Sequence, residues 1–120
     1  NLCDYAMAGT DCSVNPDVKR LAADVHKAGK PIGIICIAPV MFAKIMQEAG
    51  DSVEMTIGTD EQTSSDINFM GSNHVSCSVE DIVIDKKNKN VSTPAYMLAQ
   101  RISEVAEGIE RLVKEVLAMI

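Results

Sequence analysis

The segment that most constrains the fold is Ile32-Gly33-Ile34-Ile35-Cys36-Ile37, which carries no polar side chain facing either side. A strand that is apolar on both faces is typical of the centre of a parallel sheet, where helices cover both sides. Ala38-Pro39 follows without a break, and proline is favoured in the first turn of a helix. The sequence therefore predicts a central buried strand that turns directly into a helix.

Helix and strand patterns alternate along the rest of the chain, which favours an α/β fold. The clearest helix start is Asn15-Pro16-Asp17, where a capping side chain, a proline and an acid follow one another. The expected elements are, in order, a loop with one helical turn over Asn1–Val14, a helix ending at Gly29, the strand above, a helix from Pro39 to Gly50, a strand over Val53–Ile57, a weaker helix from about Glu61 to Met70, a strand over Val75–Cys77, and a hairpin that joins Asp81–Asp85 to Val91–Thr93.

The last expected element is a long helix from about Tyr96 to Ala118. Its apolar positions alternate steps of four and three residues, and they are Leu98, Ile102, Val105, Ile109, Leu112 and Val116. Such a stripe fits a coiled coil, but its length is the minimum for that class. A helix that lies across a sheet is the favoured interpretation.

Composition excludes several classes of function. The chain has 120 residues, 11 basic and 17 acidic side chains and a net charge of −6, and its aromatic residues are two tyrosines and two phenylalanines. An acidic surface with so few stacking side chains predicts no binding to nucleic acid. The longest apolar run, Ile34–Phe42, is too short to span a bilayer, and no secretory signal opens the chain. We expect one domain over residues 1–120, no membrane partner and no cofactor.

The four cysteines do not form a metal or disulfide pattern. Cys3, Cys12, Cys36 and Cys77 contain no C-x-x-C pair, and the two histidines match no zinc signature. We therefore expect reduced thiols in a reducing compartment and no metal. Packing or surface roles are expected for His26 and His74, a core position for Cys77, and loop positions for Cys3 and Cys12.

Cys36 is the candidate for chemistry because of its position between the strand and the helix. A side chain in such a turn is pushed out above the sheet edge where open α/β folds bind ligands. The positive end of the following helix favours a thiolate, and the Ile37 backbone N–H is expected to face an oxyanion formed on an attacked carbonyl. From spacing alone, an inert buried thiol is an equally good interpretation.

Four motifs carry a family resemblance. Pro31-Ile32-Gly33-Ile34-Ile35-Cys36-Ile37-Ala38-Pro39, Thr56-Ile57-Gly58-Thr59-Asp60, Asp81-Ile82-Val83-Ile84-Asp85 and Thr93-Pro94-Ala95-Tyr96-Met97-Leu98-Ala99-Gln100 occur in this order. Together they resemble the ElbB-like family, in the PfpI-like branch of the class I glutamine-amidotransferase-like superfamily.

The resemblance implies a flavodoxin-like three-layer sandwich with a mostly parallel sheet and a nucleophile elbow at Cys36. It implies glyoxalase activity without glutathione, in which the Cys36 thiolate adds to a small dicarbonyl such as glyoxal and a hydroxy acid is released. It also implies a homodimer in the cytoplasm, or in an organelle matrix in a eukaryote.

Family members are close to twice this length, so the chain resembles their C-terminal half. The N-terminal portion, which would carry the Gly-rich loop of the oxyanion site, then becomes a further expected partner. Gly58, Thr59 and Asp60 follow the second strand and are candidate site-lining residues, although a helix start explains Asp60 equally well.

Two other functions stay open. No histidine stands in Met55–Thr59, where triad enzymes of the superfamily place one. A reactive thiol without a base would be oxidised and turn nothing over, so a redox-sensing or chaperone-like protein is the alternative to an enzyme. Glutamine amidotransfer is the least favoured function because it needs that histidine.

Overall fold

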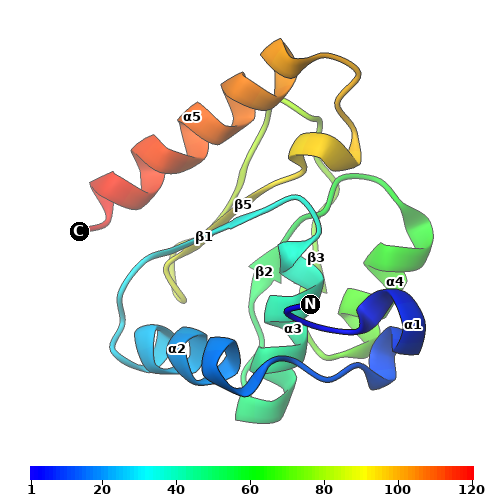
Figure 1. Ribbon diagram of the computed structural model, residues 1–120. Helices are drawn as coiled ribbons and strands as arrows, with labels where there is room; N and C mark the ends of the chain where they lie inside the picture. The colour runs from blue at the N-terminus through cyan, green and yellow to red at the C-terminus, as the bar shows by residue number, and fades with distance from the viewer.

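Five α-helices surround two small sheets in the computed structural model, which describes all 120 residues (Figure 1). The elements are α1 (Tyr5–Ala8), α2 (Pro16–Lys27), β1 (Ile32–Ile35), α3 (Ala38–Ala49), β2 (Glu54–Met55), α4 (Glu61–Phe69), β3 (Asn73–His74), β4 (Val83–Asp85), β5 (Asn90–Thr93) and α5 (Ile102–Ala118), with short 3-10 turns at Gly9–Asp11 and Ala95–Met97.

The strands pair mostly in parallel. One sheet has the order β1-β5-β4, with β1 parallel to β5 and β4 antiparallel to β5, and the other joins β2 and β3 in parallel. The register pairs Ile32 with Asn90 and Ile35 with Thr93. The α/β class is therefore confirmed, and so is the expected hairpin, which is the β4–β5 pair.

The helices lie on both sides of these strands. On one side α3 packs against β1, and α2 and α4 pack against α3; on the other side α5 lies across β5 and β1 (Figure 1). Two glycines allow this approach of α5. A Cβ on Gly33 would lie 2.7 Å from Leu112 Cδ2, and one on Gly108 would lie 2.7 Å from Thr93 Oγ1. The long helix thus crosses the sheet, as the spacing of its apolar residues predicted.

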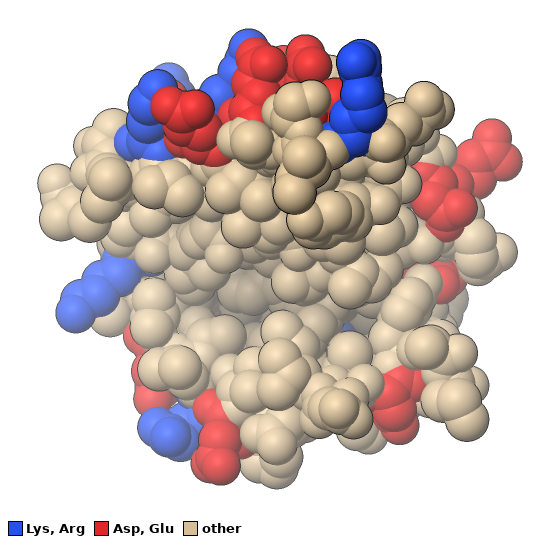
Figure 2. Space-filling view, turned by 45° about the horizontal axis from the view of Figure 1, so that its top comes forward, with Lys and Arg blue, Asp and Glu red and all other residues tan.

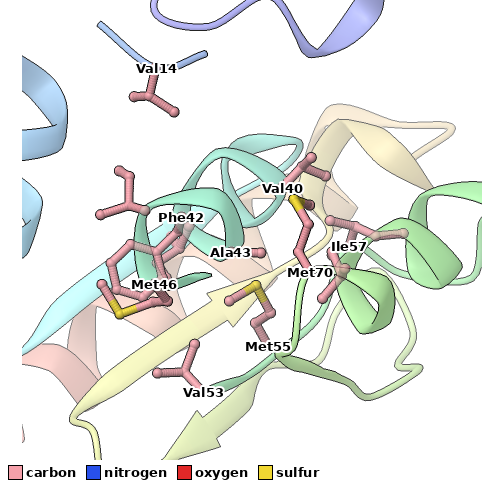
Figure 3. Packing of buried hydrophobic residues seen from close by; sticks show 12 residues of the cluster. Val14, Val40, Phe42, Ala43, Met46, Val53, Met55, Ile57 and Met70 are labelled. Carbon is pink, nitrogen blue, oxygen red and sulfur yellow. The ribbon is translucent and has the colours of Figure 1, made fainter. Parts of the chain in front are cut away.

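The core fills the space between α3, α4 and the strands. Figure 3 shows Phe42 and Met46 of α3 close to Val53 and Met55 at β2. Met46 and Met55 are fully buried, and unbranched thioether side chains of this kind fill irregular gaps well.

Side chains connect the two sheets where backbone pairing is missing. The Thr56 N–H donates to Ser92 Oγ at 2.9 Å, and Asn90 Nδ2 donates to the Glu54 carbonyl at 2.7 Å. The Glu54 N–H donates to Asp85 Oδ2 at 2.8 Å. Burial raises the pKa of the Asp85 carboxyl, but hydrogen bonds from the Asn88 side chain and from the Glu54 and Asn88 amides outweigh burial and leave that pKa low. Buried backbone groups need such partners. Polar side chains of β4 and β5 therefore hold β2 in place.

Three expected strand positions need correction. β1 lies at one edge of its sheet and not at the centre, because β5 bonds to it on one side only. The strand expected over Val53–Ile57 shortens to β2, since the amides beyond Met55 donate to side chains. Val75–Cys77 is no strand, because the pairing with β2 occurs at Asn73–His74.

The long helix begins at Ile102 and not near Tyr96. Arg101 has an extended backbone, with φ −139° and ψ 148°, so no helix continues through it. The Glu104 carboxylate accepts hydrogen bonds from the Gln100 and Arg101 amides at 2.9 and 3.2 Å, which starts the helix there. Leu98 consequently lies outside α5, and Ile102 is 77% exposed. None of the helices combines the length and apolar character needed to cross a membrane.

The side-chain bonds to β2 predict a measurable cost when one is removed. Ser92→Ala leaves the buried Thr56 N–H without its acceptor, so we expect the free energy of unfolding to fall by about 1–3 kcal/mol. Urea unfolding measures this change, and Ser65→Ala, on the exposed side of α4, is the control that stays near wild type. Equal stability of Ser92→Ala and Ser65→Ala would contradict this role of Ser92.

Candidate functional site

Cys36 occupies a strained turn between β1 and α3. Its φ is +66°, in the left-handed region that costs a residue with a side chain about 1–2 kcal/mol. The Cys36 N–H donates to the Thr93 carbonyl at 3.0 Å, which fixes the backbone at the end of the β1–β5 ladder. The chain then enters α3 within two residues. This is the geometry of a nucleophile elbow, in which a side chain stands above the ends of the strands.

The Ile37 amide lies directly after the cysteine at the amino end of α3. Its N–H donates no hydrogen bond within the chain. Pro39 in the first turn has no N–H, so the Ile37 and Ala38 amides are the first backbone donors at the amino end of α3. A helix amino end favours negative charge beside it. The expected oxyanion role of Ile37 is compatible with this geometry and stays a prediction.

Gly58 lies against the same end of β5 that holds Cys36. Its φ is +104°, and a Cβ there would lie 2.8 Å from Leu98 Cγ and 3.3 Å from Pro94 Cβ. Only glycine fits this close approach. The turn after β2 therefore rests on the segment that follows Thr93, next to the elbow.

Asp60 and Thr59 come next, and Asp60 caps α4. Its Oδ2 accepts hydrogen bonds from the Thr63 N–H at 3.0 Å and the Thr63 hydroxyl at 2.6 Å. These bonds lower the pKa of the Asp60 carboxyl. The helix-start explanation of Asp60 is thus the one that its contacts support, and the site-lining roles of Thr59 and Asp60 stay predictions.

His74 has a structural role at this edge that the sequence did not reveal in detail. Its Nε2 accepts the Ile57 N–H at 3.1 Å and lies 3.4 Å from Ser64 Oγ. Burial lowers the pKa of the ring, and only a neutral imidazole can accept that N–H. His74 therefore fixes the backbone one residue before Gly58.

His26 contacts Phe42 and Asp51. Its ring meets Phe42 edge to face at 6.4 Å, and its Nε2 lies 3.0 Å from Asp51 Oδ2. The packing role expected for His26 agrees with these contacts. Both histidines thus have Nε2 partners other than Cys36.

The other cysteines lie in different surroundings. Burial raises the pKa of the Cys12 and Cys77 thiols. Cys77 is half-buried outside any strand, and its thiol donates to the Ser78 carbonyl at 3.4 Å, so the expected core position is wrong. Cys3 packs beside Val14 in the opening segment. Nowhere do three His, Cys, Asp or Glu side chains come together as metal ligands would.

The chain is similar in sequence to known proteins. No family model matches the chain. It is 37% identical over 128 residues to the human "Glutamine amidotransferase-like class 1 domain-containing protein 3, mitochondrial", a match over 99% of this chain and 46% of that protein. It is 36% identical to the rat "ES1 protein homolog, mitochondrial", over 99% of this chain and 47% of that protein.

A solved structure has the same fold. It is the crystal structure of an isoprenoid biosynthesis protein with amidotransferase-like domain from Ehrlichia chaffeensis, with a TM-score of 0.81 and 28% identity over 89% of this chain and 49% of that one. The chain resembles the ElbB-like proteins of the glutamine amidotransferase-like superfamily, as its motifs predicted. The chain spans about half the length of the curated relatives it matches.

The strained elbow predicts an unusual order of stability for two variants. Cys36→Ala and Cys36→Gly both remove the thiol, but only glycine relieves the left-handed backbone. We expect Cys36→Gly to exceed Cys36→Ala in free energy of unfolding by about 1 kcal/mol in urea titrations. The same pair of substitutions at Cys77 is the control, and alanine should be the more stable variant there. An alanine preference at position 36 would contradict the elbow geometry.

The hydrogen bond to His74 predicts a pH dependence of stability. Since the pKa of His74 is lowered on folding, the unfolded chain binds the proton more tightly. Stability is therefore full above about pH 6.5, the ordinary histidine value, and falls as the pH drops from there toward the lower folded pKa. His74→Gln should remove this part of the pH dependence while its amide oxygen still accepts the Ile57 N–H. Thermal unfolding between pH 7.5 and pH 5 measures the effect, and an unchanged pH profile in His74→Gln would contradict it.

Proposed function

We propose that Cys36 is the nucleophile of a glyoxalase-like reaction that converts small dicarbonyls such as glyoxal to hydroxy acids without glutathione. The observation that carries the proposal is the Cys36 backbone at φ +66°, followed by the unbonded Ile37 amide at the start of α3. The proposed substrate is a small aldehyde. The activity is proposed for a full-length ElbB-like domain that contains this chain.

The proposed chemistry needs no external oxidant. The Cys36 thiolate adds to one aldehyde carbon of glyoxal, and the carbonyl electron pair moves to oxygen, where the Ile37 N–H stabilises the charge before a proton arrives. That carbon then loses its hydrogen as a proton, and the neighbouring carbon gains one, which gives a glycolyl thioester on Cys36. Water attacks the thioester, so that glycolic acid leaves and the thiol is restored. One carbon is oxidised, the other is reduced, and one water is consumed.

The names of two relatives support a cellular location for this chain. The human and rat relatives are named as mitochondrial, which favours the organelle matrix over the cytoplasm for this chain. Both are reducing compartments in which a free thiol persists.

The test is steady-state consumption of glyoxal by the full-length protein with wild-type Cys36, with Cys36→Ala and with Cys77→Ala. We expect Cys36→Ala to lose at least about 100-fold in kcat/KM, as expected when a covalent nucleophile is removed, and Cys77→Ala to keep the wild-type rate. Glycolate formation, followed by chromatography, confirms the product. Equal rates in wild type and Cys36→Ala would remove the enzyme function from this residue.

The alternative is a redox-sensing protein, and the positions of the histidines favour it. His26 and His74 each hold another partner through Nε2, and neither ring is hydrogen-bonded to the Cys36 thiol in this chain. A thiolate without a base forms sulfenic acid with peroxide and turns over no aldehyde. Sulfenic acid at Cys36 under mild peroxide, together with no glyoxal consumption, would support this second function.

A further inference from the structure

Cys3 and Cys12 lie on one face of a short antiparallel pairing in the opening segment. Cys3 forms an isolated bridge with Val14, and beside it the Asp4 N–H donates to the Ser13 carbonyl at 3.3 Å. The backbone of Cys12 is extended, with φ −62° and ψ 156°, and side chains of an extended chain alternate between its two faces. Cys12 stands two residues before Val14, so its side chain lies on the same face as that of Cys3.

The two thiols also interact electrostatically. Burial raises the pKa of the Cys12 thiol most, a charge on Cys3 raises it further, and the Lys44 ammonium lowers it. A Coulomb interaction falls off with distance, so the two sulfur atoms are neighbours. Cys77, by contrast, has no second thiol among the groups that shift its pKa, which burial raises.

A disulfide between these two residues needs only a small movement of the backbone. Diagonal neighbours on an antiparallel pair have Cα atoms about 7–8 Å apart and Cβ atoms that are closer, and a disulfide accepts Cα separations up to about 6.8 Å. The Asp4–Ser13 hydrogen bond of 3.3 Å is longer than usual, and Leu2 and Asp4 are exposed. A shift of about 1 Å in the segment that carries Cys3 is therefore enough.

The charge around the pair selects the kind of oxidant. Residues 1–18 contain three Asp and no Lys or Arg. In Figure 2 the right margin of the molecule, on the side where α1 lies in Figure 1, shows Asp and Glu but no Lys or Arg. Lys44 of α3 reaches this segment, and its Nζ donates to the Thr10 carbonyl at 2.9 Å. An acidic surface disfavours the approach of an anionic oxidant and favours an uncharged one such as hydrogen peroxide.

We propose that Cys3 and Cys12 form a reversible disulfide, which closes a loop around α1 when a peroxide oxidises the protein. Cys3 reacts first because it is half-buried, whereas Cys12 is 2% exposed. The peroxide transfers one oxygen atom to the Cys3 sulfur and leaves as water, which gives a sulfenic acid. The Cys12 sulfur then attacks the Cys3 sulfur, and the second oxygen atom leaves as water. Both sulfur atoms are oxidised, the peroxide is reduced, and a small thiol such as glutathione reverses the reaction.

The disulfide would fix a segment that contacts two helices near the elbow. The Tyr5 hydroxyl donates to Asp66 Oδ2 of α4 at 2.6 Å, and the Thr10 carbonyl accepts from Lys44 of α3. Both contacts come from residues between the two cysteines. Closure of this loop removes unfolded conformations of the segment, so the oxidised protein is the more stable form. The disulfide site is separate from Cys36 and does not depend on turnover there.

Mass spectrometry of tryptic peptides tests the proposal in the full-length protein that contains this chain. Lys19 is the first basic residue of the chain, so trypsin leaves Cys3 and Cys12 in one peptide and separates them from Cys36 and Cys77. We expect this peptide to become lighter by two hydrogen atoms after brief treatment with hydrogen peroxide and blocking of the free thiols. Dithiothreitol should restore its original mass.

A glutathione redox buffer measures whether the fold brings the two thiols together. Two cysteines at this spacing can also pair in an unfolded chain, so the folded protein is compared with the protein in urea. We expect the equilibrium constant for disulfide formation to be at least about tenfold larger in the folded protein, because the fold holds the sulfur atoms close together. Since the two equilibria are linked, oxidation should raise the folding equilibrium constant by the same factor.

Three serine variants complete the test. Cys12→Ser should replace the disulfide by a glutathione adduct on Cys3, and Cys3→Ser, at the more exposed position, should leave Cys12 reduced. Cys77→Ser is the matched control and should behave as wild type. Equal equilibrium constants in the folded and the urea-unfolded protein would overturn the proposal. A glutathione adduct on Cys3 of the folded wild type beside a free Cys12, or a disulfide between two chains through Cys3, would overturn it as well.

Discussion

The hydrogen bond from the Cys36 N–H to the Thr93 carbonyl is the contact on which the arrangement of the site depends. It is the last bond at the carboxyl end of β1, and the residue that makes it has a φ of +66°. Because the strand continues into α3 within two residues, the turn has no length in which to relax. The buried side chains of α3 pack in the core and keep the helix where it is. The backbone strain at Cys36 is thus maintained by the β1–β5 ladder on one side and by core packing on the other.

A second constraint comes from polar side chains that substitute for backbone pairing. Ser92 and Asn90 of β5 hold β2, and His74 of β3 holds the amide of Ile57. The turn at Gly58 follows these bonds and rests against Pro94. The end of β1, the end of β5 and the turn after β2 therefore meet at the edge that bears Cys36. Their relative positions depend on a few buried hydrogen bonds. Each of these bonds is worth more in the interior than at the surface, because an unpartnered group there has no water to replace it.

Local patterns predicted the elements well, and distant contacts account for what they did not predict. The apolar run before Ala38-Pro39 predicted the strand, the turn and the helix. The two short strands on either side of the polar turn at residues 86–90 predicted the β4–β5 hairpin. The edge position of β1 could not be predicted, because an apolar run does not say how many neighbours a strand has. The start of α5 depends on the extended backbone of Arg101 and on the Glu104 carboxylate, which interrupt a stripe of apolar residues that continues in the sequence. The contact of His74 with Ile57 joins residues 17 positions apart, and no spacing rule identifies such a pair.

The central claim is that the elbow makes Cys36 the reactive thiol of this chain. The most direct measurement is peptide mapping by mass spectrometry after brief treatment of the folded chain with a limiting amount of iodoacetamide at pH 7. Cys36 lies in the strained turn at the amino end of α3, whereas burial raises the pKa of the thiols of Cys12 and Cys77. We predict that Cys36 is alkylated at least about tenfold faster than Cys77. Alkylation of Cys77 or Cys3 ahead of Cys36 would contradict the account.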